Sequence, residues 1–262
     1  MDAGFLASLF ALGLIGGFLS GLLGIGGGII MVPLLLYVPP ALGFAALGMK
    51  VVAGITSVQS FFGAISGAVG HKRHKRINMP LALTVGGSMA VASLISSYFS
   101  TYVSEQLMLM VFAGMAIAAA VMMFVPKPES GDEIAAHELQ FNTPLAVLIG
   151  LVIGTLSGII GQGGAFLFIP AMMFLLHIPT RIAIGSALVI GIASSFAVFI
   201  GRAGTNQIPY LMSIVLVAGV LLGAQFGSEV SQKTPKKLLR QILAVLITAT
   251  ALKMWYEIVS FA

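Results

Sequence analysis

The sequence contains no cysteine and very few charged residues. The lack of cysteine excludes disulfide bridges, thiolate metal ligands and thiol redox chemistry. Charged residues make up 8% of the 262 residues, whereas hydrophobic residues make up 58%. A soluble domain carries about 25% charged residues, so this chain has too little polar surface to cover a water-soluble globule. Its mean hydropathy of +1.08 indicates a polytopic membrane protein in a lipid bilayer.

Acidic residues are scarce, and none lies in the middle of an apolar stretch. The eight Asp and Glu residues fall at chain ends, in loops or at predicted helix ends: Asp2, Glu105, Glu129, Asp132, Glu133, Glu138, Glu229 and Glu257. This distribution argues against a buried carboxylate proton relay and against a simple cation as substrate. We expect no nucleic-acid partner, because the 13 Lys and Arg residues are spread among spanning segments and serve to orient them. We also expect no metal and no cofactor.

Glycine, in contrast, is abundant, with 32 residues. The first apolar stretch, residues 5–46, is about twice the length that crosses the hydrocarbon core, so it must fold back or break. The glycine cluster at 24–28 marks the break, and a second cluster at 161–164 interrupts the apolar stretch 145–176. Residues 20–67 align with residues 157–204 without a gap, and the identical pairs include Gly24 with Gly161 and Pro33 with Pro170. We interpret this as an internal repeat.

The predicted fold class is an all-α polytopic membrane protein built from two homologous, inverted repeats. The first repeat covers residues 1–125, the polar linker 126–142, and the second repeat 143–262. We expect about eight membrane segments, of which the first in each repeat is broken at its glycine turn into a helical hairpin. The arms of the first hairpin are expected near 5–22 and 28–41, and the last span near 238–259.

The distribution of basic residues favours hairpins over straight spans. If each broken stretch returns to its own side, ten Lys and Arg residues lie on one side of the membrane and three, Lys50, Arg202 and Lys253, on the other. If each stretch crosses once and the repeats are parallel, the division is seven against six. The positive-inside rule therefore favours inverted repeats, with the linker in the cytoplasm and both termini outside. The basic cluster 71–76 serves as an anchor for this topology.

The glycine turns are the first candidates for a binding site. A turn inside the membrane frees backbone N–H groups, and the helix that follows begins with the positive end of its dipole, so an anion satisfies both. Polar side chains on the next helix can add ligands without a full charge. The candidate substrate-binding residues are Gly26, Gly27, Gly28, Gln162, Gly163, Gly164, Ser57, Gln59, Ser186 and Ser194.

Each candidate also has a purely structural interpretation. The glycines can serve only to let helices approach closely, and the hydroxyl groups can bond to their own helix or join two helices. Lys50 and Arg202 can attract an anion, but we expect their long side chains to reach the lipid head groups instead.

The two glycine turns carry a family resemblance. The segments GLLGIGGGIIMVP at 21–33 and GIIGQGGAFLFIP at 158–170 resemble the sulfite exporter TauE/SafE family, as does the stretch from Pro179 to Ser186. The resemblance implies an inner-membrane transporter of small sulfur-containing anions such as sulfite or sulfoacetate. Members often have Gly-Thr or Gly-Ser entering the second helix of each repeat. Gly185-Ser186 matches this pattern, but the first copy reads Gly48-Met49, so the two half-sites are expected to be unequal.

Three functions remain open at this point. The first is a secondary transporter of a small anion, sulfite or an organosulfonate, that works by alternating access around the paired glycine turns. The second is a passive anion channel on the same scaffold. The third, an intramembrane hydrolase, is disfavoured because no His lies mid-span and no Gly-x-Ser-x-Gly motif occurs. We therefore expect no enzymatic activity and no catalytic residue.

Overall fold

The computed structural model describes residues 2–23, 28–70, 77–124 and 139–234, together with 245, 248 and 253–255. All regular structure in these residues is helical, which confirms the all-α class. In chain order the elements are α1 (Ala3–Leu23), α2 (Gly28–Ala41), α3 (Met49–Gly70), α4 (Met79–Phe99), the 3₁₀ turn η1 (Ser100–Tyr102), α5 (Glu105–Phe124), α6 (Thr143–Ile160), α7 (Ala165–Leu175), α8 (Thr180–Ala203) and α9 (Tyr210–Lys233).

Six of the helices are long and apolar enough to cross a membrane: α1, α4, α5, α6, α8 and α9. The helices α2 and α7, which follow the glycine clusters, are apolar but shorter. The helix α3 has 22 residues and carries a buried polar group of side chains at 56–60. The predicted span 238–259, the basic cluster 71–76 and most of the linker lie largely or wholly outside the described residues.

Two helices begin at the same local signal. Asn78 precedes α4, and its Oδ1 accepts a 2.7 Å hydrogen bond from the backbone N–H of Leu81. Asn142 precedes α6, and its Oδ1 accepts a 3.0 Å bond from the N–H of Leu145. In both cases a proline stands in the first turn, where its missing N–H costs no hydrogen bond.

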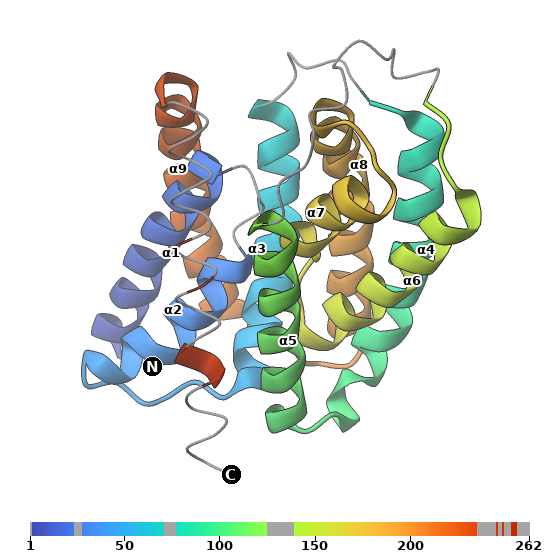
Figure 1. Ribbon diagram of the computed structural model, residues 1–262. Coiled ribbons are helices and arrows are strands. Elements are labelled where there is room, and N and C mark those ends of the chain that lie inside the picture. Colours follow the sequence, from blue (N-terminus) through green and yellow to red (C-terminus); the bar gives the residue numbers. More distant parts are fainter. Residues whose placement is uncertain are drawn as a thin grey trace.

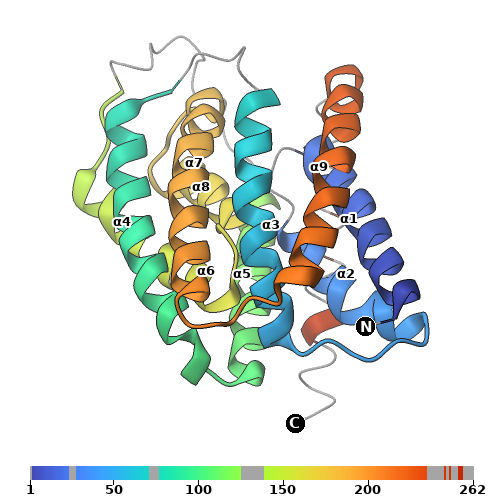
Figure 2. The same cartoon turned by 180° about the vertical axis from the view of Figure 1, so that it is seen from behind.

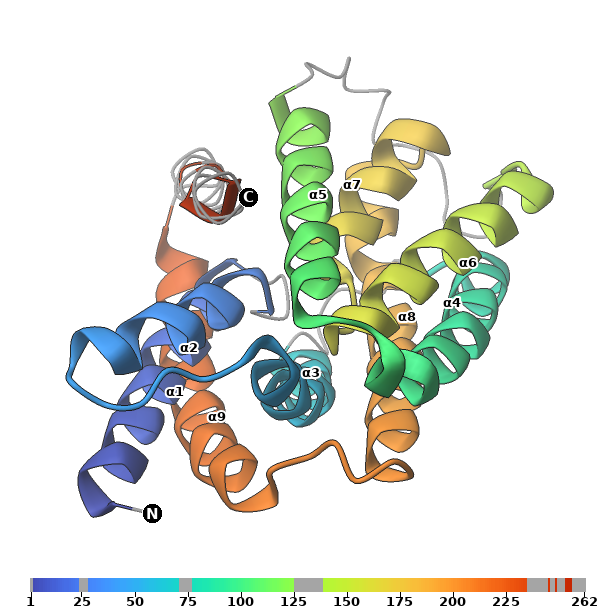
Figure 3. The ribbon, with the colours of Figure 1, turned by 90° about the horizontal axis from the view of Figure 1, so that it is seen from below.

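The two broken segments point in opposite directions. Figure 1 shows the α1–α2 pair opening toward the end of the molecule where the N-terminus lies, and the α6–α7 pair opening toward the other end. Seen from behind, α3 and α8 stand side by side between α4 and α9 (Figure 2). Seen from below, α1, α2 and α9 form one group and α4, α6 and α8 another, with α3 between them (Figure 3).

Glycine allows the closest helix contacts in each group. A Cβ added to Gly17 of α1 would collide with the backbone of Val220 in α9, and one added to Gly223 of α9 would collide with the carbonyl oxygen of Leu14. On the other side, a Cβ on Gly154 of α6 would lie 2.5 Å from the carbonyl oxygen of Met89 in α4. In a bilayer the hydrophobic effect does not drive helices together, so association depends on close van der Waals packing. Small residues at such contacts allow that packing.

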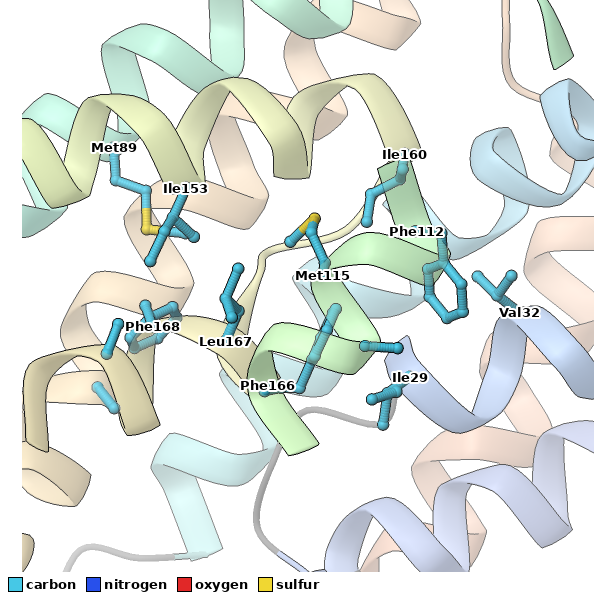
Figure 4. Packing of buried hydrophobic residues seen from close by; sticks show 14 of the residues in the cluster. Ile29, Val32, Met89, Phe112, Met115, Ile153, Ile160, Phe166, Leu167 and Phe168 are labelled. Atoms are coloured by element: carbon cyan, nitrogen blue, oxygen red, sulfur yellow. The ribbon is translucent and has the colours of Figure 1, made fainter. Parts of the chain in front are cut away.

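The apolar core joins the second broken segment to α5 and α2. Phe112 of α5 lies against Phe166 of α7, with ring centroids 6.1 Å apart. Figure 4 shows Phe166 together with Met115, Ile29 and other buried side chains from α2, α4, α5 and α6. Near the C-terminus, Nζ of Lys253 lies 3.7 Å from the ring centroid of Tyr37, so residues 253–255 lie close to α2. These contacts hold both short helices in the interior.

Candidate functional site: the second glycine turn

The break between α6 and α7 is formed by two glycines in the left-handed conformation. Gly161 ends α6 with φ of 77°, and Gly164 precedes α7 with φ of 67°. The N–H of Gln162 donates to the carbonyl of Ser157 at 2.9 Å, and the N–H of Gly161 donates to that of Gly158 at 3.3 Å. This pair of bonds is the Schellman arrangement, which ends a helix at a glycine. The sequence therefore specifies a sharp stop and restart at this point.

The turn is wedged between α3 and α8. A Cβ added to Gly161 would collide with the carbonyl oxygen of Ala53 in α3. A Cβ added to Gly163 would lie 3.2 Å from the Cβ of Ser195 in α8. Thr56 Oγ1 donates to the carbonyl of Gly161 at 3.3 Å. The glycines are thus needed both for backbone conformation and for close packing.

Several predicted site residues meet at this turn. The Nε2 of Gln162 donates to the carbonyl of Gly28, the first residue of α2, at 2.8 Å. Ser194 Oγ donates to the carbonyl of Gly163 at 3.3 Å and lies 3.4 Å from the Oγ of Ser93. Gln162 is 1% exposed, and both serines are buried. The structure therefore brings Gly28, Gln162, Gly163, Gly164 and Ser194 together.

Other predicted site residues do not reach the turn in the described contacts. The Oγ of Ser186 accepts from the backbone N–H of Asn78, at the start of α4, at 3.1 Å. The Oγ of Ser57 donates to the carbonyl of Gly54 in its own helix at 2.7 Å, as the structural interpretation expected. Gln59 is fully buried in α3. Gly26 and Gly27 lie outside the described residues, so the first turn stays a prediction.

Hydrogen bonding at the turn is unequal between acceptors and donors. The carbonyls of Gly158, Gly161, Gly163 and Gly164 all accept hydrogen bonds from protein groups. Within the described part of the chain, no hydrogen bond is found from the N–H of Gly163 or Gly164. These donors lie where α7 begins, at the positive end of its dipole. Unpaired backbone donors at the start of a helix suit an anion.

Ser157 also lies at this turn, although it is not among the site residues predicted from the sequence. Its Oγ is buried without a hydrogen-bond partner, and a Cβ added to Gly164 would collide with it. The Oε1 of Gln162 is likewise buried without a partner. The signal for Ser157 was present, because it aligns with Ser20 when residues 157–204 are matched to residues 20–67. Thr56 and Ser93 were also missed as contacts of the turn, since only the packing of helices brings them there.

Arg202 does not reach the lipid head groups, so that expectation was wrong. It is 0% exposed, and its Nη2 donates to the carbonyls of Gly158 at 3.2 Å and Ile159 at 2.7 Å. Its Nη1 donates to Oε1 of Gln207 at 2.9 Å. The side chain turns inward because α6 ends beside it and offers the carbonyl oxygens of its last turn, which the helix itself leaves only partly paired. Lys50 is partly buried, and its Nζ donates to the carbonyl of Thr101 at 2.9 Å.

Comparison with known proteins identifies relatives over nearly the whole chain. The model of the family described as "Sulfite exporter TauE/SafE" matches residues 9–254. The chain is similar to the probable membrane transporter protein YunE of Bacillus subtilis, at 23% identity over 95% of this chain and 97% of the relative. It is also similar to YdhB of the same organism, at 27% identity over 90% and 92%. A probable membrane transporter protein of Methanocaldococcus jannaschii is 26% identical, over 94% of each chain. No solved structure matches the chain significantly.

Proposed function

The chain belongs to the sulfite exporter TauE/SafE family of membrane transporters, and from this premise we propose that it carries a small anion, sulfite or an organosulfonate. We further propose that it is a secondary transporter of the inner membrane that alternates between two openings around its glycine turns. The candidate ligands at the second turn are the N–H groups of Gly163 and Gly164, with Gln162, Ser194 and Ser157 around them.

One observation carries this proposal. At the second turn the backbone carbonyls of Gly161, Gly163 and Gly164 are paired with protein donors, whereas the N–H groups of Gly163 and Gly164 have no acceptor in the described residues. An unpaired N–H in a nonpolar interior costs several kcal/mol, so a bound ligand that accepts hydrogen bonds stabilises this turn. A metal cation would be repelled by the N–H groups and by the positive end of the α7 dipole. In the described residues no group of three or more His, Asp or Glu could hold one.

The opposite directions of the two broken pairs support an alternating mechanism. The α1–α2 pair and the α6–α7 pair open toward opposite ends of the molecule, and α3 lies against α8 between them (Figure 1). Transporters with inverted repeats place the substrate where broken helices meet and move one repeat against the other. The hydrogen bond from Gln162 to Gly28 joins the two broken pairs at that place.

Uptake into proteoliposomes tests the proposal. Labelled sulfite and a panel of sulfonates are offered to the wild-type protein and to Gly163→Leu, whose Cβ alone would lie a tight 3.2 Å from the Cβ of Ser195. Gly114→Leu is the matched control, because a Cβ at Gly114 of α5 meets nothing within 4 Å. We expect saturable uptake with counterflow in the wild type and the control, and none in folded Gly163→Leu.

The other outcomes are equally informative. Uptake that does not saturate and shows no counterflow would identify a channel on this scaffold. Absence of flux for every panel member, with folded wild-type protein, would overturn the assignment to sulfur-containing anions.

A further inference from the structure

We propose that the second glycine turn binds a single monovalent anion whose charge is balanced by Arg202. This inference rests on the proposed function and narrows it. It selects hydrogen sulfite and simple sulfonates over a doubly charged substrate such as sulfoacetate.

Arg202 is a buried cation without a carboxylate partner. Its guanidinium group is fully buried, and no Asp or Glu of the described residues lies within ion-pairing distance of it. Its Nε has no hydrogen-bond partner at all. A buried charge is strongly disfavoured unless an opposite charge compensates it. The carbonyl oxygens around Arg202 supply only partial charges, so its one positive charge has no full opposite charge among the described residues.

The position of Arg202 changes the electrostatics of the turn. The turn joins the C-terminal end of α6, which is negative, to the N-terminal end of α7, which is positive. Without a cation the two ends oppose each other, and an anion at the turn gains little. Arg202 covers the carbonyls of Gly158 and Ile159, in the last turn of α6. With that end neutralised, the positive end of α7 and the N–H groups of Gly163 and Gly164 dominate.

The first repeat lacks both polar groups. In the alignment of residues 20–67 with 157–204, Ile25 stands where the second repeat has Gln162, and Ile65 stands where it has Arg202. Ile65 is 38% exposed, on the outside of α3, whereas Arg202 is buried. Gln162 and Arg202 therefore have no counterpart in the first repeat, which supports the second turn as the anion site.

Two substrates with the same head group test the charge. Methanesulfonate is monovalent, and sulfoacetate has the same sulfonate with a second negative charge. Each is added as a competitor while the full-length protein takes up labelled sulfite into proteoliposomes. We expect methanesulfonate to compete at least about tenfold better, because a second buried charge would stay unpaired. Equal competition by sulfoacetate would overturn the monovalent assignment.

Variants of Arg202 and its neighbour test the role of the guanidinium charge. Arg202→Gln should raise the KM for methanesulfonate at least about tenfold, and Arg202→Lys should recover part of the loss. Gln207→Glu is the sharper variant, because it sets a carboxylate at the position of the Oε1 that Arg202 already contacts. It keeps Arg202 in place and removes its net charge. Lys50→Gln, a loss of charge away from the turn, should leave the KM unchanged.

The results separate the two proposals. If the wild type carries no anion of the panel, the proposed function fails. If the wild type carries methanesulfonate and Gln207→Glu binds it as well as the wild type does, Arg202 only caps α6 and the present inference fails. If Arg202→Gln does not fold, Gln207→Glu still decides, because a purely structural arginine gains a partner from the new carboxylate and anion binding does not change.

Discussion

The side-chain amide of Gln162 donates a 2.8 Å hydrogen bond to the carbonyl oxygen of Gly28, and so links the turn between α6 and α7 to the first residue of α2. The contact is tight, because a Cβ added to Gly28 would lie 2.7 Å from Cδ of Gln162. The one polar side chain within the second glycine cluster therefore holds the two broken segments together. A movement that separates α2 from the turn between α6 and α7 must break this bond.

We expect Gln162→Ala to weaken both the fold and transport. It leaves the carbonyl of Gly28 without its donor, and hydrogen bonds between membrane helices contribute about 0.6–2 kcal/mol. The thermal midpoint of the purified protein should fall, and the KM for the anion should change. Gln106→Ala on the exposed side of α5 is the control and should change neither quantity. An unchanged thermal midpoint and an unchanged KM in Gln162→Ala would show that this hydrogen bond contributes to neither stability nor transport.

Gly164→Ala should be poorly tolerated. The left-handed φ of 67° costs a residue with a Cβ about 1–2 kcal/mol. That Cβ would also collide with Ser157 Oγ and lie 2.8 Å from Cε of Met89. Thermal unfolding and uptake should both decline. Gly87→Ala in α4 is the matched control, because its Cβ meets nothing within 4 Å and alanine favours helix. A Gly164→Ala protein as stable and active as Gly87→Ala would contradict the observed turn.

Gly17→Leu should separate α1 from α9 without altering the choice of substrate. The leucine side chain would collide with the backbone of Val220, so the yield of folded protein and its thermal midpoint should drop. Since this contact lies away from the second turn, the ratio of KM values for methanesulfonate and sulfoacetate should stay as in the wild type. Gly63→Leu, which faces open space in α3, serves for comparison. A changed ratio would mean that this contact takes part in selectivity.

The topology can be tested with single cysteines, since the native chain has none. We expect Ala45→Cys and Gly204→Cys to react with a membrane-impermeant thiol reagent from outside the cell. Ser130→Cys in the linker should react only after the membrane is opened. Parallel repeats would instead put Gly204→Cys and Ser130→Cys on the same side. Labelling of both from one side would therefore rule out the hairpin arrangement.

Much of the architecture could be predicted from local sequence. The helical class follows because a bilayer forces every backbone group to bond within the segment, and long apolar stretches leave only helices. The break at 161–164 follows from its glycines, since only they adopt the left-handed conformation without strain. The starts of α4 and α6 follow from an Asn placed two residues before a Pro. Gln162, Gly163 and Gly164 were correctly expected to lie at one turn, because they are neighbours in the chain.

The roles of single polar side chains depended on how the helices pack. Ser186 and Ser194 belong to one helix and were equal candidates, yet Ser194 meets Gly163 while Ser186 meets the start of α4. Arg202 looked like a residue at a membrane surface, because the sequence indicates that α8 ends there. It is buried because another helix, α6, ends beside it and presents its carbonyl oxygens. Periodicity and composition describe one segment at a time, whereas the place where a neighbouring segment ends is a property of the assembled molecule.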